Sequence, residues 1–345
     1  MVIPIQNIYY LLSYAWDKID WLPDPELLGG EAGESSINLL ASMLLPEVQH
    51  LVNGGLATDY KIHKHQIRGI KGKLLLNETL RHHLKSAAGQ TVCLVEELSP
   101  DIFPNQVIKT TLLQLQQTEG LFSKFKKVTA NLLPAFESVQ LLSPAFSANL
   151  TNQLPRYQIS RYRFVLNCCT FIQHNLLPVS GLEEYTFKSF LKDKKQMATI
   201  FESFVRNFYR LEQTVFEVKS EKINWKSEEL TKEAQDFLPA MYTDISLLSP
   251  GRKIIIDTKF YKKALLPHYQ KEILHSKHLY QLFAYLQNSS IKATNQVLEG
   301  ILLYPVVSKE LNLEYLLSGN KVKVCAINLN QPWQGIKQDL LKLIA

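Results

Sequence analysis

Two acidic positions and one lysine form the part of the sequence best suited to chemistry on a phosphodiester. Asp244 stands early in one apolar stretch, and Asp257, Thr258 and Lys259 close the next one. Residues 249–252 between them have the composition of a turn, so the two stretches are predicted to form a hairpin. Adjacent strands lie roughly 5 Å apart, which would bring the two carboxylates together.

This set of side chains fits a metal-dependent reaction. Mg2+ prefers hard oxygen ligands, and phosphodiester hydrolysis also needs a cation near the attacking water or the developing charge. Asp257 and Lys259 share one face of the predicted strand, and the Thr258 carbonyl is free to serve as a third oxygen ligand. We predict that Asp244, Asp257 and the Thr258 carbonyl hold one or two Mg2+ ions and that Lys259 acts on the water or the transition state.

An acid two residues before a lysine also occurs by chance. Residues 59–61, 193–195 and 217–219 fit the same pattern, but none has both an apolar strand before it and an acidic partner across a turn. The alternative for Asp257 and Lys259 is an ordinary ion pair at the end of a strand.

Two predicted helices supply further candidates. Residues 272–286 have apolar side chains at helical spacing, and Gln281 and Tyr285 are i,i+4 neighbours on one stripe of that helix. Glu202 lies slightly off the aromatic stripe of a helix at residues 197–211. It is either a surface glutamate or an additional metal ligand.

The order of these features resembles the PD-(D/E)xK nucleases of the RecB-like type. Asp244, then Asp257 with Lys259, then Gln281 with Tyr285 follow the order of the motifs in that family. Pro239 would be a displaced counterpart of the motif's proline. The resemblance implies an α+β or α/β fold in which an αβββαβ core forms a mixed sheet flanked by helices.

The first half of the chain has a different residue pattern from the second half. Aromatic residues at helical spacing open it, further helices are predicted, and residues 60–67 read as extended. The glycine-punctuated turn that follows carries Arg68, Lys71 and Lys73 but lacks the spacing of a P-loop, so no nucleotide site is expected. We predict a mainly helical domain with a β-hairpin or finger at residues 1–180, and a nuclease domain at 181–345.

The composition is that of a globular protein. The 345 residues are 46% hydrophobic with a formal net charge of +6, which permits an anionic partner such as double-stranded DNA. No apolar run is long enough to cross a membrane and no signal peptide is recognisable, so we expect a cytoplasmic protein without membrane contact. The four cysteines lack metal-ligand spacing and are expected to be buried thiols.

The amino-terminal sequence resembles the opening of the McrC family, the nuclease subunits of McrBC-type modification-dependent restriction systems. The resemblance continues along essentially the whole chain, at residues 3–16, 69–73, 105–112, 238–245, 256–261, 279–282 and 303–305.

Membership of that family would imply a division of labour. The partner would be a hexameric McrB-like AAA+ GTPase that reads the modified DNA and translocates. The chain would insert its first half into the pore of the ring, stimulate GTP hydrolysis and cut the DNA. Arg68, Lys71 and Lys73 would then lie at the docking tip, although a solvated turn explains them nearly as well.

Two other functions fit the same residues. The chain would be a stand-alone RecB-like nuclease or junction resolvase if it cuts DNA without an NTPase. It would be a regulatory adaptor of an AAA+ NTPase if its nuclease site were inactive, which the presence of Asp244, Asp257 and Lys259 argues against.

Overall fold

A computed structural model describes residues 3–18, 36–83, 89–142, 159–181, 184–226, 237–261, 265–268, 271–289, 297–306 and 311–345. The chain forms two compact units. One consists of Leu40–Lys188, and the other combines Met1–Leu39 with Ser189–Ala345.

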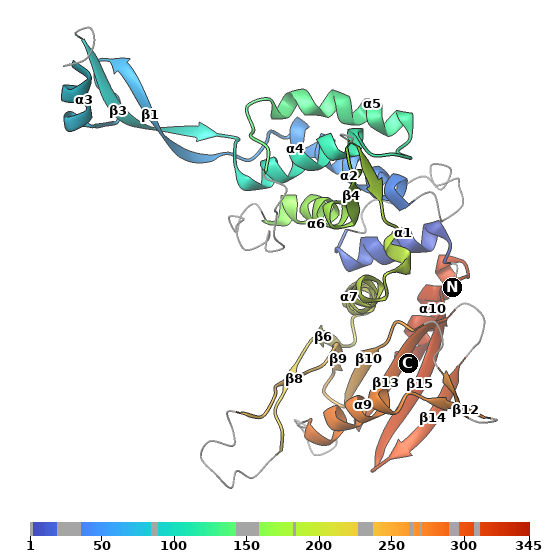
Figure 1. Ribbon diagram of the computed structural model, residues 1–345. Coiled ribbons are helices and arrows are strands. Elements are labelled where there is room, and N and C mark those ends of the chain that lie inside the picture. The colour runs from blue at the N-terminus through green and yellow to red at the C-terminus, as the bar shows by residue number, and fades with distance from the viewer. Residues whose placement is uncertain are drawn as a thin grey trace. The chain divides into compact units, whose positions relative to one another are not determined.

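The second of these units is built around a six-stranded mixed sheet (Figure 1). The strand order is β14-β15-β13-β10-β9-β6, with parallel pairing of β10 to β13 and of β13 to β15 and antiparallel pairing elsewhere. The predicted mixed sheet is therefore confirmed. The strands are β6 (Glu217–Lys219), β9 (Ile245–Leu248), β10 (Arg252–Thr258), β13 (Val297–Val306), β14 (Asn312–Leu317) and β15 (Asn320–Asn328).

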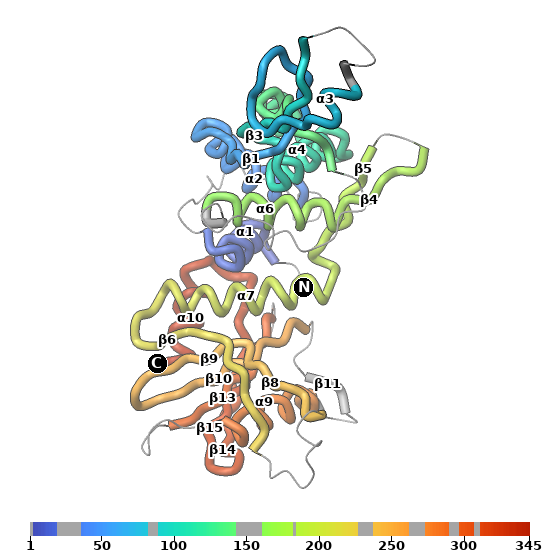
Figure 2. Tube along the Cα trace, turned by 90° about the vertical axis from the view of Figure 1, so that its left-hand side faces the viewer, coloured from blue at the N-terminus to red at the C-terminus, as the bar shows by residue number. Residues whose placement is uncertain are grey.

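Helices flank this sheet (Figure 2). They are α7 (Lys194–Glu212), α9 (Ser276–Asn288) and α10 (Trp333–Ile344), while α1 (Ile5–Ala15) packs on α7 and a short 3-10 helix lies at Phe190–Lys192. Helix α7 begins where the Asp193 side chain accepts hydrogen bonds from the backbone amides of Lys195 and Gln196, as an N-cap does. Its buried aromatic stripe is the predicted one.

Two small pairs of strands are inserted into this unit. They are β7 (Lys222–Ile223) with β8 (Met241–Tyr242), and β11 (Leu265–His268) with β12 (Lys271–Leu274). The helix predicted from residue 272 therefore starts only at Ser276. Residues 271–274 pair with β11, and this pairing overrides their apparent helical spacing.

Helix α9 packs very closely on the sheet at Gly300. A Cβ atom there would lie 2.9 Å from Leu286 Cδ1 and 3.0 Å from Leu282 Cδ2, which is shorter than a normal contact. We expect Gly300→Ala to lower the free energy of unfolding by about 1–3 kcal/mol, because the Leu282 and Leu286 side chains must shift within a packed core. The matched control is Gly251→Ala, since a Cβ there meets nothing within 4 Å. Urea unfolding that gives both variants equal stability would contradict this prediction.

The amino-terminal helix belongs to the sheet unit, which differs from the predicted boundary near residue 180. The Tyr14 ring packs 5.8 Å from Phe204, 5.6 Å from Phe208 and 5.1 Å from Trp333, measured between ring centroids. Asn207 Nδ2 donates a hydrogen bond to the Tyr14 carbonyl at 2.8 Å. These aromatic side chains therefore form part of a core.

The other unit is mainly helical and carries the β-finger (Figure 1). The finger consists of β1 paired antiparallel with β3 along their whole length, with β2 on the other side of β3, and α3. Its elements are β1 (Asp59–Arg68), β2 (Lys73–Leu74), α3 (Leu76–His83) and β3 (Gln90–Ser99). The others are α2 (Ser36–Asn53), α4 (Phe103–Gln116), α5 (Ser123–Leu132), a 3-10 helix (Leu133–Phe136), α6 (Ile159–Asn175), β4 (Leu176–Pro178) and β5 (Tyr185–Phe187).

A buried polar network holds the root of the finger. Asn105 Nδ2 donates to the carbonyl of Ala57, just before β1, at 2.9 Å and to that of Pro100, just after β3, at 2.7 Å. The Tyr162 hydroxyl donates to Asn105 Oδ1 at 2.9 Å and accepts from the Ala57 amide at 2.8 Å. Since Asn105 is fully buried and all these groups are paired, both strands are fixed to α4 and α6.

Two expectations from composition concern the described residues. The four cysteines are buried free thiols, as expected. No helix in the described ranges is long and apolar enough to cross a membrane.

Candidate active site

The β9–β10 hairpin brings the two predicted aspartates to the same end of the sheet. Ile256 pairs with Ile245, so the residues that flank this pair, Asp257 and Asp244, lie next to each other. Asp244 Oδ2 accepts hydrogen bonds from the Thr258 amide at 2.8 Å and from Thr258 Oγ1 at 3.0 Å. The hairpin geometry predicted from the sequence is confirmed.

Asp257 is fully buried, and Lys259 is its neighbour on the same face of the strand. Lys259 Nζ lies 2.7 Å from Asp257 Oδ2 in an ion pair. Burial raises the pKa of Asp257 to about 7. The Lys259 ammonium opposes this shift, whereas the carboxylates of Asp244 and Glu202 add to it. Asp257 therefore shares a site with two other carboxyl groups, whose charges disfavour its ionised form.

The oxygens of Asp257 fit a divalent cation. Beyond the ion pair with Lys259, neither oxygen has a hydrogen-bond partner among the described residues, although a buried carboxylate normally has several partners. A cation would supply the missing interaction. No three His, Cys, Asp or Glu side chains of the described residues are grouped closely enough to hold an ion, so backbone carbonyls and water would be needed as ligands too, as Mg2+ accepts.

Helix α7 contributes a third carboxylate and a cation. Burial raises the pKa of Glu202, and the charge of Asp244 raises it further, while Arg206 and Lys259 act in the opposite direction. Arg206 forms an ion pair with Glu202 and donates from Nε to the Asp244 carbonyl at 3.1 Å. Glu202 thus lies within electrostatic reach of the aspartates, and sequence reasoning missed Arg206.

Helix α9 places Gln281 and Tyr285 beside the carboxylates. Gln281 Nε2 donates to the Tyr285 hydroxyl at 2.7 Å. Burial raises the pKa of Tyr285, the hydrogen bond from Gln281 opposes this shift, and Asp257 and Asp244 add to it. The hydroxyl therefore keeps its proton and remains a donor toward the acidic cluster.

Sequence reasoning missed a second polar pair at the site. His278 Nδ1 lies 2.9 Å from the Tyr304 hydroxyl, and both side chains are buried. Burial lowers the pKa of His278 to about 4, with His275 and Lys259 acting in the same direction. His278 precedes Gln281 by three residues, so the helical spacing already placed it on the same stripe.

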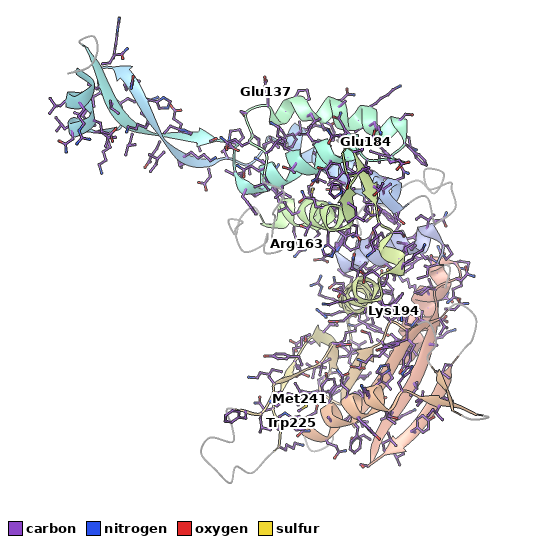
Figure 3. The ribbon with its side chains drawn as sticks, in the orientation of Figure 1. Glu137, Arg163, Glu184, Lys194, Trp225 and Met241 are labelled. Carbon is purple, nitrogen blue, oxygen red and sulfur yellow. The ribbon has the colours of Figure 1, made fainter. Side chains whose placement is uncertain are left out.

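The strands β7 and β8 form an arm that adjoins Asp244. Figure 3 shows Trp225 and Met241 on this arm, where Trp225 Nε1 donates to the Pro239 carbonyl at 2.8 Å. Thr243 is buried, and its amide donates to the Glu221 carbonyl at 3.0 Å. Asp244 is therefore held between a fixed arm and β9.

Comparisons with known proteins identify the family. The family model described as "McrBC 5-methylcytosine restriction system component" matches residues 25–305. The chain is 32% identical over 349 residues to the Escherichia coli (strain K12) protein "Type IV methyl-directed restriction enzyme EcoKMcrBC", covering 99% of this chain and 97% of that protein. The chain belongs to the McrBC 5-methylcytosine restriction system component family.

A solved structure shares the fold of this McrBC-family chain. It is described as a refined half-complex from a tetradecameric assembly of Thermococcus gammatolerans McrB AAA+ hexamers with bound McrC. The match has a TM-score of 0.51 at 16% identity and covers 99% of this chain and 76% of the other. At this identity the likeness concerns the fold alone.

The three basic residues predicted for docking lie on the finger of this McrBC-family chain. Arg68 ends β1, Lys73 begins β2, and Lys71 lies between them with its Nζ 3.4 Å from Glu97 Oε1. All three are exposed. Gly72 between them has a φ of +75°, and a Cβ there would lie 2.2 Å from the Leu94 carbonyl oxygen, so the tight turn requires glycine.

The other acid-x-lysine sequences have ordinary structural roles. Asp193 caps α7, the Glu217–Lys219 pair is solvent-accessible with 3.4 Å between charged atoms, and Asp59 is exposed at the start of β1. Surface charges of this kind contribute little energy. Of these sequences, the one at residues 257–259 has a buried acid, Asp257, that lies beside a second acid, Asp244.

Proposed function

We propose that this chain is the nuclease subunit of an McrBC-type restriction system and hydrolyses phosphodiester bonds of modified DNA in a Mg2+-dependent reaction. One observation carries the proposal. Buried Asp257 lies next to Asp244, and beyond its ion pair with Lys259 its two oxygens have no hydrogen-bond partner among the described residues. A carboxylate in this state suits metal chemistry better than structural support.

Each side chain would have a distinct part in the reaction. Asp244, Asp257 and the Thr258 carbonyl would hold Mg2+, with Glu202 as a further ligand or as an acceptor for a bound water. When bound, the ion polarises the scissile phosphate and lowers the pKa of the attacking water. The Lys259 ammonium would donate hydrogen bonds to that water or to a phosphate oxygen. Gln281 and the Tyr285 hydroxyl would position the DNA backbone.

The strand topology supports a PD-(D/E)xK core. Helix α7, strands β6, β9 and β10, helix α9 and strand β13 follow one another in the predicted αβββαβ order, apart from the two inserted strand pairs. The antiparallel β9–β10 pair followed by a crossover through α9 to parallel β13 places both acids at one end of the central strands. In that arrangement both acidic groups of the β9–β10 pair lie at the same end of the sheet.

The partner would be an McrB-like AAA+ GTPase ring. The related structure contains McrB AAA+ hexamers with bound McrC. The β-finger, with its exposed basic turn, is the element we propose to enter the ring. Recognition of 5-methylcytosine would then belong to the partner.

Cleavage assays distinguish this function from its alternatives. The full chain should cut 5-methylcytosine-containing plasmid DNA only when Mg2+, the AAA+ partner and its nucleotide are all present. Cutting by the chain with Mg2+ alone would show a stand-alone nuclease. Stimulation of the partner's GTPase without any cutting would show a regulatory adaptor.

A further inference from the structure

Tyr304 lies on the same face of the sheet as the charged pair. Strands β10 and β13 are parallel, with Asp257 opposite Leu302, and Lys259 and Tyr304 each follow two residues later. The Lys259 amide donates to the Leu303 carbonyl at 2.9 Å, which extends the strand pairing to the catalytic lysine. Side chains two residues apart on a strand share a face, so Lys259 and Tyr304 lie side by side.

Helix α9 lays His278 over this face. His278 precedes Tyr285 by seven residues, so both project from one helical stripe. Its Nδ1 is 2.9 Å from the Tyr304 hydroxyl, and only 7% of its surface is exposed. Rings enclose the imidazole, because the Tyr261 centroid lies 4.7 Å away and the His275 ring stacks on it at 4.7 Å.

The charged groups of the site affect the pKa values of this pair. Lys259 contributes to the lowered pKa of His278, and Asp257 contributes to the raised pKa of Tyr304, in each case after the larger effect of burial. At neutral pH the imidazole is uncharged and the hydroxyl keeps its proton. The hydroxyl can then donate to Nδ1, which leaves the imidazole proton on Nε2.

We propose that Tyr304 and His278 are positioning residues for Lys259, in an inference that rests on the proposed nuclease function. The Tyr304 hydroxyl fixes the orientation and tautomer of the His278 ring, and Tyr304, held by that ring, restricts the Lys259 side chain that lies beside it. The lysine is thereby confined to its place beside Asp257.

The flexibility of the Lys259 side chain explains why neighbouring residues would be needed to hold it in place. A lysine side chain has several rotatable bonds, and ordering it costs up to roughly 2 kcal/mol. Lys259 is 15% exposed and approaches Asp257 through one contact. A neutral ring held by a hydrogen bond restricts the lysine without adding a second positive charge to the pocket.

Kinetics of a double-mutant cycle test the proposal. The variants are Tyr304→Phe, His278→Ala and their combination, assayed with the full chain, the AAA+ partner, saturating Mg2+ and 5-methylcytosine-containing DNA. Tyr209→Phe is the matched control, because Tyr209 is also fully buried in this unit and its hydroxyl donates to the Leu340 carbonyl at 2.8 Å. Each variant at the site is expected to lower kcat roughly 10-fold with KM unchanged.

The combination should lose no more activity than His278→Ala alone, because the hydroxyl acts only through the ring. Tyr209→Phe should keep kcat within about twofold of the parent. As a second readout, 15N NMR of the metal-free chain should show His278 protonated at Nε2 in the parent and in Tyr209→Phe, and a mixture of tautomers in Tyr304→Phe.

The possible outcomes distinguish failure of the positioning role from failure of the proposed nuclease function. An unchanged kcat in Tyr304→Phe, a loss equal to that of Tyr209→Phe, or additive losses in the combination would overturn the positioning role. An unchanged His278 tautomer in Tyr304→Phe would overturn it as well. If the parent cuts no DNA, or Asp257→Asn cuts as well as the parent, the nuclease function itself fails and the positioning role fails with it.

Discussion

Asp257→Asn is expected to lower DNA cleavage by roughly 100-fold or more, because a metal ligand that acts on the transition state contributes several kcal/mol. The asparagine keeps the shape of the side chain but lacks the charge that would hold Mg2+. Stimulation of the partner's GTPase should be unchanged, since the finger belongs to the other compact unit. Cleavage of 5-methylcytosine-containing plasmid and GTP hydrolysis are measured on the same preparations.

Glu299→Gln provides the matched control. Glu299 is a buried carboxylate on the neighbouring strand β13, where it forms an ion pair with Arg252 at the far end of β10 from Asp257. This variant should lose stability but keep cleavage. Equal loss of cleavage in both variants would show that Asp257 acts only on the fold. Joint loss of cleavage and GTPase stimulation in Asp257→Asn would show the same.

The pH dependence of the stability of the metal-free chain should depend on the same carboxylate, Asp257. The pKa of Asp257 is raised from 3.8 to about 7, so between these pH values the folded state binds more protons than the unfolded state. Stability therefore falls as pH rises through this window, by on the order of 4 kcal/mol at most. Asp257→Asn lacks this loss, and urea unfolding at pH 8 without metal should find it more stable than the parent.

Adding Mg2+ at pH 8 should restore stability to the parent and not to Asp257→Asn, because an ion that binds only the folded state stabilises it. A parent that is more stable than the variant at pH 8 without metal would contradict the assignment of Asp257 as a buried, uncompensated charge.

Reversing the charge of the finger turn should have the second large effect. The triple variant Arg68→Glu, Lys71→Glu and Lys73→Glu is expected to lower stimulation of the partner's GTPase roughly 10-fold or more. Reversing three charges at a docking surface removes charge complementarity with the partner and so weakens association. All three side chains are exposed, and the Lys71–Glu97 pair is weak at 3.4 Å, so the fold should persist.

A second charge reversal in the same unit controls for net charge. Lys124, Lys126 and Lys127 lie on α5, away from the finger strands, and changing all three to Glu alters the total charge equally. This control should stimulate the GTPase normally and bind Mg2+ normally. Equal losses in the two triple variants would show that overall charge, and not the finger turn, governs the partner's activity.

Local patterns predicted most of what surrounds the site. Alternation and turn composition were sufficient for the β9–β10 hairpin, because its partners are adjacent in sequence and its register follows from the turn. The aromatic stripe of α7 and the Gln281–Tyr285 pair followed from helical spacing alone. Neighbouring residues specify these features.

Contacts between distant residues could not be predicted in this way. The packing of Tyr14 on Phe204 joins residues nearly two hundred positions apart, and no local pattern reports it. The start of α9 was misplaced because pairing between β11 and β12 overrides local propensity. His278 meets Tyr304 only because α9 packs on β13, which no local pattern indicates.

The polar network at the root of the finger restricts bending there, so that the root does not serve as a hinge. Asn105 holds the chain on both sides of the finger, and Tyr162 holds Asn105. We therefore expect the finger strands to move together with α4 and α6, with little bending at residues 57–59 or 99–101. A force on the finger turn would then reach both helices across the full length of two 10-residue strands.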